Sequence, residues 1–204
     1  GESITLGVNF KNQKMTNSDI EEIEDYLDFK LATVFRFEDE KKIPTKSTLN
    51  KKRSNFFGHV TYKPSDIFFL NYDFSINDDL NKFDYNSIAT TLKLNNFSHE
   101  IDFLEERGIV GNSNIISHES LLKFNEENSL SFKTRRNRTL SLTEYYNLLY
   151  EYKNDCLIAG VKYKKQYYED KDIKPLEELF FSITIVPLTT FSPDKMILNK
   201  NRID

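Results

Sequence analysis

The sequence contains one cysteine, no tryptophan, and only six glycines and five prolines among its 204 residues. So few glycines and prolines exclude a low-complexity linker. No apolar run approaches the roughly 18 residues that a membrane-spanning helix needs. The three histidines lack the close spacing of metal ligands, so we expect no metal site. The net charge of −4 is too mild to suggest a nucleic-acid scaffold.

Sequence signals of catalysis are also lacking. The acidic pairs Glu21-Glu22 and Glu126-Glu127 lie in expected connections between strands, where solvated charge is the ordinary interpretation. The chain contains no Gly-x-Ser-x-Gly motif, phosphate-binding loop or dinucleotide fingerprint. We therefore predict that the protein is not an enzyme and binds no cofactor.

What the chain does contain is strict alternation of apolar and polar residues. In residues 67–77, one face would carry Phe68, Leu70, Tyr72, Phe74 and Ile76, and the other Asn71, Asp73, Ser75 and Asn77. A period of two is that of a β-strand. Segments of about ten such residues are typical of a transmembrane β-barrel wall. A soluble barrel or sandwich remains open, because alternation alone does not say whether lipid or a protein core covers the apolar face.

The same pattern predicts about eleven strands. They are expected at residues 3–11, 26–37, 55–63, 67–77, 85–94, 97–105, 116–124, 129–136, 143–152, 156–167 and 179–186. The connections after the third, fifth, seventh and ninth strands are short, and the others are longer and polar. Residues 12–25 break this rule, and the spacing of Ile20, Ile23, Leu27 and Leu31 leaves a short helix over 18–31 as an alternative.

These observations predict an all-β fold, an antiparallel up-and-down meander that forms a partial transmembrane β-barrel. Bacterial single-chain barrels have even strand numbers, so an odd count points to a piece of a larger barrel in the cell outer membrane. No signal peptide is visible, which suggests a processed protein or a fragment. We expect residues 1–190 to be the C-terminal portion of the barrel and 191–204 a periplasmic tail.

The last third of the chain resembles a known family. Residues 152–163, Tyr-Lys-Asn-Asp-Cys-Leu-Ile-Ala-Gly-Val-Lys-Tyr, resemble the penultimate hairpin of the LPS-assembly protein LptD. Residues 168–175 are similar to its last external loop, and 179–188 to its final strand. The resemblance extends upstream to Pro64-Ser65-Asp66 and to the hairpin at 85–105, and covers about residues 55–190.

The resemblance implies a function and a set of partners. Members of the LptD family form a large outer-membrane barrel around the plug lipoprotein LptE, receive lipopolysaccharide from the periplasmic Lpt bridge, and release it through a lateral opening between the first and last strands. The jellyroll and first strands of the family would lie outside this sequence. A porin-like or autotransporter-like barrel that carries solutes or a passenger is the alternative, because nothing in the alternation separates the two.

The resemblance also assigns roles to residues. The lateral-gate strand would contain Leu179, Phe181, Ile183, Ile185 and Pro187, and its second edge is expected to be unpaired within this chain. The family pattern often has two adjacent cysteines where this chain has Asp155-Cys156, so Cys156 is a possible disulfide partner of a distant segment, with a small buried thiol as the alternative.

Basic residues are the remaining candidates. Lys162, Lys164 and Gln166 alternate with Val161 and Tyr163, so they should point into the lumen, toward a plug protein or polar sugar. Arg135, Arg136 and Arg138 and the cluster Lys51-Lys52-Arg53 are expected in or beside external loops. Either could pair with lipopolysaccharide phosphates, but solvated loop charge is the slightly favoured interpretation.

Overall fold

A computed structural model describes residues 2–15, 23–170, 172–186, 189–191 and 196–197. No helix in this part of the chain is long and apolar enough to cross a membrane. One short 3-10 helix, η1 (Thr45–Ser47), interrupts an otherwise all-β structure over these residues.

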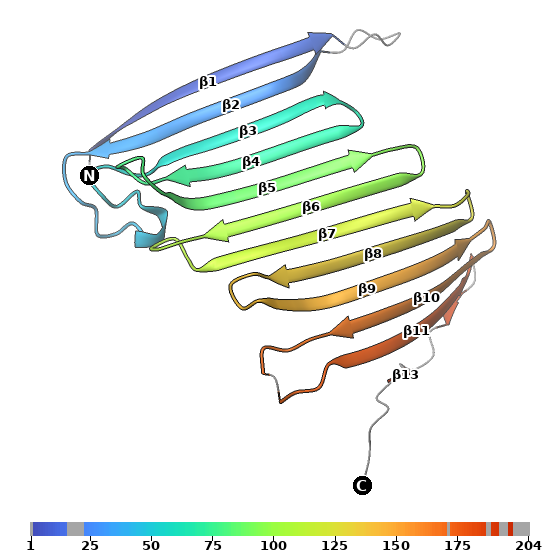
Figure 1. Cartoon of the computed structure of the whole chain (residues 1–204). Helices are drawn as coiled ribbons and strands as arrows, with labels where there is room; N and C mark the ends of the chain where they lie inside the picture. The colour runs from blue at the N-terminus through green and yellow to red at the C-terminus, as the bar shows by residue number, and fades with distance from the viewer. Residues whose placement is uncertain (1, 16–22, 171, 187–188, 192–195, 198–204) are drawn as a thin grey trace. The chain divides into compact units, whose positions relative to one another are not determined.

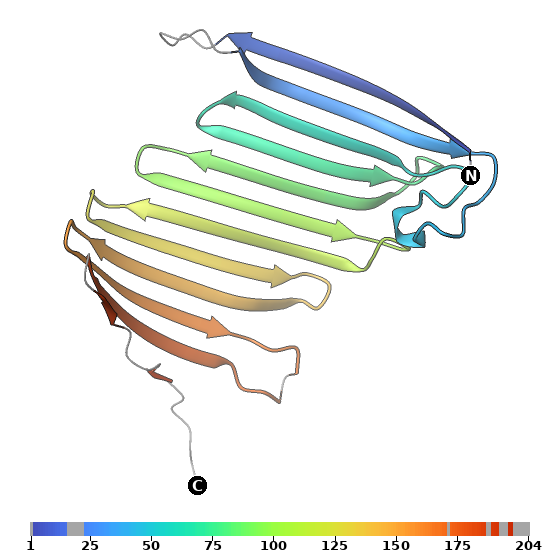
Figure 2. The same cartoon turned by 180° about the vertical axis from the view of Figure 1, so that it is seen from behind.

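The strands follow one another in the sheet in the order of the sequence (Figures 1 and 2). They are β1 (Ser3–Met15), β2 (Ile23–Arg36), β3 (Phe56–Ser65), β4 (Phe68–Ile76), β5 (Phe83–Lys93), β6 (Phe97–Glu106), β7 (Ser113–Lys123), β8 (Asn128–Asn137), β9 (Leu142–Lys153), β10 (Leu157–Gln166) and β11 (Leu176–Ile185), followed by the short β12 (Thr189–Phe191) and β13 (Met196–Ile197). The predicted all-β antiparallel meander is confirmed.

The chain divides into two compact units. Residues 1–92 and 101–114 form the first, in which β1 to β5 pair successively as antiparallel neighbours. Residues 93–100 and 115–204 form the second, in which β7 to β11 do the same. In each unit, residues directly opposite on paired strands share one face, so the register decides which side chains meet.

One alternative and one prediction at the ends of the meander are wrong. β1 continues to Met15 and β2 begins at Ile23, so the helix considered for residues 18–31 is absent from 23–31, and the rest of that segment lies outside the described residues. The second edge of β11 is paired rather than open, because Ile183–Ile185 face Thr189–Phe191 of β12, and Glu178 and Leu179 face β13.

The predicted alternation of connection lengths is largely present. The short connections are 66–67, 94–96, 124–127 and 154–156, and the longer ones are 37–55, 77–82, 107–112 and 167–175. The exception is 138–141 after β8, which is as short as the turn before it. The connection that includes Glu21-Glu22 lies outside the described residues.

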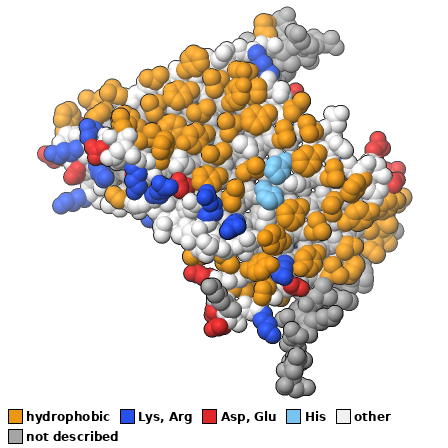
Figure 3. All heavy atoms as spheres, viewed as in Figure 1, with side chains coloured by type: hydrophobic (Ala, Val, Ile, Leu, Met, Phe, Trp, Pro, Cys, Tyr) orange, Lys and Arg blue, Asp and Glu red, His pale blue; other side chains and the backbone are white. Residues whose placement is uncertain are grey.

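One face of each unit carries apolar side chains without a covering protein layer. Among the described residues, no hydrophobic side chain is buried. Val8 is 63% exposed in β1, and Leu148 and Phe181 are 40% and 42% exposed in β9 and β11. The stripe from Phe68 to Ile76 is only half-buried. Figure 3 shows the hydrophobic side chains gathered over β1 to β5 of the first unit. The alternation therefore marks an apolar face, and not a protein core.

On the apolar face, Gly58 of β3 lies under the aromatic ring of Phe74 of β4. The two residues are directly opposite, and a Cβ added at Gly58 would lie 2.0 Å from Phe74 Cζ. An aromatic ring packed over a cross-strand glycine excludes water from the exposed backbone. The Phe74 ring therefore leaves no space for a side chain at position 58.

We expect Gly58→Ala to lower the free energy of unfolding by about 1–3 kcal/mol, because the added methyl group displaces the ring. In a Phe74→Leu background the same change should cost clearly less, because the shorter side chain leaves space. Urea unfolding of the four proteins of this double-mutant cycle measures the coupling. Equal costs in both backgrounds would contradict the contact.

Candidate functional site

Polar and ionisable side chains gather on the opposite face of the first unit. The register places Lys30, His59 and Asp73 on one cross-strand row of β2, β3 and β4. The next row along the strands contains Ala32, Phe57, Ser75 and Tyr85, from β2 to β5. A polar row therefore lies beside a row with two aromatic rings.

His59 and Asp73 are the centre of a closed hydrogen-bond ring. His59 Nδ1 lies 2.6 Å from Asp73 Oδ1, and His59 Nε2 lies 3.0 Å from Thr61 Oγ1. Thr61 donates to Asn71 Oδ1 at 3.0 Å, and Asn71 Nδ2 donates to Asp73 Oδ2 at 2.9 Å. Reversing the Asn71 amide would place its oxygen against the Asp73 carboxylate.

The direction of these hydrogen bonds decides what the ring can do. Threonine, histidine and aspartate in this order could act as nucleophile, base and orienting acid. The single hydroxyl proton of Thr61 is donated to Asn71, however, so His59 Nε2 does not receive it. The hydrogen bond between His59 Nδ1 and Asp73 Oδ1 therefore joins β3 to β4, and the ring does not activate the Thr61 hydroxyl.

The connection 37–55 folds onto this polar face. Asn55 is 2% exposed, and its amide donates to Ser75 Oγ and Asp84 Oδ2, both at 3.0 Å. Ser54 and Thr48 are similarly buried, and Thr48 Oγ1 accepts from the Asn55 backbone N–H. The best-buried side chains of the described residues thus form a polar junction that fastens the connection to the sheet.

Local chemistry shapes the rest of the connection. Pro44 precedes η1, and Thr48 ends it in the left-handed region with φ of 57°. Arg36 Nε donates to Leu49 O at 2.6 Å, which ties the far side of the connection to β2. The Lys42 backbone N–H donates to Glu40, and this hydrogen bond lowers the pKa of the Glu40 carboxyl. The second half of the connection is therefore attached to the sheet at Leu49 as well as at Asn55.

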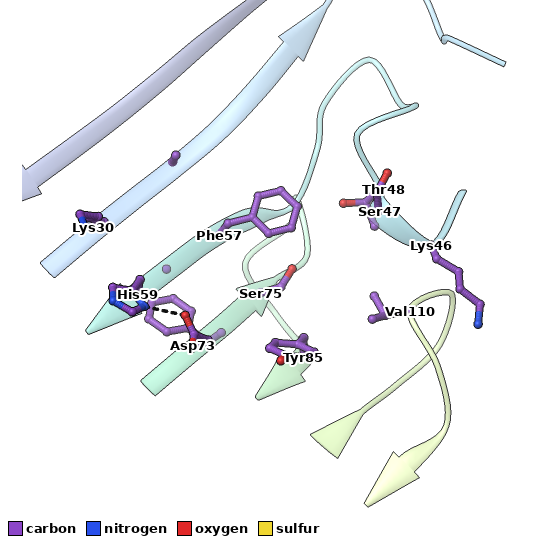
Figure 4. Close-up of a pocket in the computed structure, with 13 residues that line it drawn as sticks. Lys30, Lys46, Ser47, Thr48, Phe57, His59, Asp73, Ser75, Tyr85 and Val110 are labelled. Atoms are coloured by element: carbon purple, nitrogen blue, oxygen red, sulfur yellow. Dashed lines mark hydrogen bonds and ion pairs between the residues drawn. The ribbon is translucent and has the colours of Figure 1, made fainter. Parts of the chain in front are cut away.

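A pocket of about 470 Å³ lies between the connection and the sheet (Figure 4). Its floor consists of side chains from the two rows, with His59 and Asp73 at one end and Phe57, Ser75 and Tyr85 beside them. The lining also includes Gly58 and Phe74 of the sheet, Lys46, Ser47 and Thr48 of the connection, and Val110 of the 107–112 connection. The volume falls within the range of about 300–1,000 Å³ that is typical of ligand pockets.

The alternation in the sequence did not predict this pocket. It placed Asn71 and Asp73 on the polar face, but which residues of β2, β3 and β5 lie opposite them depends on register and bulges. β3 and β4 lose register between Tyr62 and Ser65, and β4 and β5 between Ser75 and Ile76.

The second unit has a polar row that includes one predicted residue. Glu119, Lys133, Asn147, Lys164 and Glu178 lie directly opposite one another across β7 to β11. Lys133 Nζ is 2.7 Å from Glu119, and Lys164 Nζ is 3.9 Å from Glu178, which is 4% exposed. Lys162, Lys164 and Gln166 alternate along β10 and so share this face, where Lys162 Nζ lies 5.9 Å from the centre of the Phe180 ring. That this face lines a lumen stays a prediction.

The other predicted basic residues do not form one cluster. Arg135 is inside β8, with Nε 3.0 Å from Glu144 Oε2, and Arg136 follows it beyond a register shift. Arg138 is in the connection 138–141. In the first unit, Arg53 lies 3.6 Å and 3.7 Å from the carboxylates of Asp78 and Asp79. Arg135 and Arg53 therefore pair with carboxylates of the protein itself.

Of the predicted gate residues, Leu179 is half-buried on β11, and Phe181, Ile183 and Ile185 are exposed on its apolar face. Pro187 lies outside the described residues. Cys156 is exposed in the turn 154–156, where its N–H donates to Asn154 Oδ1. The alternative of a buried thiol is therefore wrong, and the disulfide stays a prediction.

Two histidines that are distant in the sequence meet in the second unit. The rings of His99 and His118 are 5.6 Å apart, and His99 Nδ1 lies 2.7 Å from Ser120 Oγ. Aromatic contacts extend the row from Phe97 to Phe132. No group of metal-ligating side chains is found among the described residues, so this pair has an aromatic environment and not a metal-site geometry.

No protein-family model matches the chain, and no curated protein matches it. Among solved structures, three mutants of the Rh. blastica porin match with a TM-score of 0.44 and 9–10% identity. Each alignment covers 90% of this chain and 85% of the porin chain.

Proposed function

We propose that this chain is part of the wall of an outer-membrane β-barrel that inserts lipopolysaccharide into the outer leaflet through a lateral opening. The observation that carries the membrane part is the apolar face without a covering layer, since no described hydrophobic side chain is buried. A lipid environment would cover that face, and a barrel satisfies its backbone hydrogen bonds between strands.

The translocon part is supported by the resemblance of the Cys156 hairpin and the last strand to the LptD family. β11 is a long strand with an exposed apolar stripe, and among the described residues its second edge pairs with the short strands β12 and β13. In this proposal those short strands are replaced when the first barrel strand meets β11. The polar face of each unit would then line the lumen, where LptE and the saccharide pass.

The proposal predicts that a covalently closed seam blocks export. One cysteine is placed at Ile183 and a second on the first strand of the full-length protein, in a Cys156→Ser background. We expect the cross-linked barrel to assemble but to deliver little lipopolysaccharide to the cell surface, and a reductant to restore delivery. Surface lipopolysaccharide and heat-modified mobility of the barrel measure the two properties.

The matched control places cysteines at Val161 and Phe181, which are directly opposite on β10 and β11 within the wall. That cross-link should leave export unchanged. Normal export with the seam fully cross-linked would contradict the lateral opening. Uptake of small solutes that is lost on cross-linking, with export unaffected, would favour the porin-like alternative.

A further inference from the structure

The pocket beneath the connection 37–55 has an apolar lining and a group of basic side chains. The proposed function explains neither property. Its exposed surface is mainly apolar, with contributions from Ala32, Phe57, Tyr85 and Val110. This is unusual on the polar face of the sheet, where the neighbouring row is ionisable. A lumen that only needed to stay hydrated would not require an apolar hollow of about 470 Å³.

The ionisable residues of the lining are predominantly basic. Lys30, Lys46 and His59 line the pocket together with a single acidic residue, Asp73. Asp73 is already bonded to His59 and Asn71, and Lys30 Nζ is 3.0 Å from Asp28 Oδ2. Lys46 is exposed at the other end of the pocket and extends from η1 (Figure 4). The charge around the apolar hollow therefore favours an anionic ligand.

We propose that this pocket binds an anion with a compact apolar body, of the class of medium-chain carboxylates and sulfonates. The apolar body lies between Phe57, Tyr85 and Val110, and the anionic end lies at Lys46. Convergence of a few polar groups on an apolar cavity of this size is the ordinary form of a small-molecule site. The buried Asn55 junction keeps the pocket formed, because it fixes the connection that serves as its roof.

The absence of native tryptophan provides a clean assay. In the full chain held in dodecyl maltoside, Tyr85→Trp places the only indole in the pocket wall, and a medium-chain ω-bromoalkanoate quenches it on contact. We expect quenching that saturates. The reference variant Leu148→Trp places the indole on the apolar face, where quenching should rise with concentration without saturating, because it reports partition into the micelle.

Charge is tested by Lys46→Gln, which should weaken saturable binding by about two- to fivefold, the effect of losing one exposed ion pair. Lys42→Gln, on the same connection but outside the lining, should leave it unchanged. Val110→Trp in the native Tyr85 background fills the pocket, and we expect calorimetry to show no saturable binding of the alkanoate to it.

Two results would overturn the proposal. If quenching of the Tyr85→Trp variant does not saturate and equals that of the Leu148→Trp variant, the pocket contains no binding site. Equal binding of an ω-bromoalkyl maltoside, unaffected by Lys46→Gln, would show that the site does not select an anion. Vesicles of brominated phosphatidylglycerol distinguish the source of the ligand: quenching of the pocket indole by vesicles would assign the anion to a membrane lipid, and quenching by the alkanoate alone to a free amphiphile.

Discussion

Leu148→Arg should destabilise the protein in a bilayer by about 2–4 kcal/mol, the cost of a cation on the lipid face of a barrel. Leu148 is 40% exposed in β9, directly between Phe132 of β8 and Tyr163 of β10. In water the same exposed position would accept arginine at little cost. The effect therefore depends on what covers the face.

The matched control is Ser129→Arg, on the opposite face of the same unit. Ser129 lies directly between Glu151 of β9 and Lys123 of β7, so the new guanidinium would meet one charge of each sign at a solvated position, and we expect a change within about 0.5 kcal/mol. Urea titrations of both variants in phosphatidylcholine vesicles give the free energies. A small cost for Leu148→Arg, comparable with that of Ser129→Arg, would indicate that the face is solvated.

Asn55→Leu should lower the free energy of unfolding by about 2–4 kcal/mol, since it leaves buried polar groups without a partner. The Asn55 amide is the donor to both Ser75 and the Asp84 carboxylate, and leucine of similar size cannot replace it. The connection 37–55 should then detach from the sheet and become sensitive to proteases. Asn96→Leu, in the exposed turn 94–96, should change stability by less than about 0.5 kcal/mol.

Limited proteolysis and urea unfolding measure the two consequences separately. Cleavage within residues 37–55 of the Asn55→Leu variant, with the strands intact, is expected. If the Asn55→Leu variant keeps its stability and its connection resists proteolysis, the Asn55 junction does not hold the connection on the sheet.

The strands were predictable because alternation is a local property. β6 was expected at 97–105 and is found at Phe97–Glu106, and β8 differs from its expected bounds by one residue at each end. The pattern failed at the end of β1, where Asn12, Gln13 and Lys14 are polar on both faces. β1 nevertheless extends to Met15, because its last residues pair with β2. β12 and β13 are too short, at three and two residues, to produce a pattern.

The pocket and its junction could not be predicted in the same way. Asn55 was placed at the start of a strand, but its burial depends on Ser75 and Asp84, which belong to two other strands. His59 and Asp73 meet because β3 and β4 pair in one register, and a shift by one residue would separate them. Such contacts follow from turns and bulges that alternation does not encode.

The central claim is that lipid covers the apolar face, and collisional accessibility of spin labels tests it most directly. Single labels are placed at Val161, Lys162, Tyr163 and Lys164 of β10, in a Cys156→Ser background of the reconstituted full-length protein. We predict strict alternation, with oxygen reaching positions 161 and 163 from the lipid and a polar nickel reagent reaching 162 and 164. If neither oxygen nor the nickel reagent reaches the labels at positions 161 and 163, a protein core covers the apolar face, and the claim that lipid covers it is contradicted.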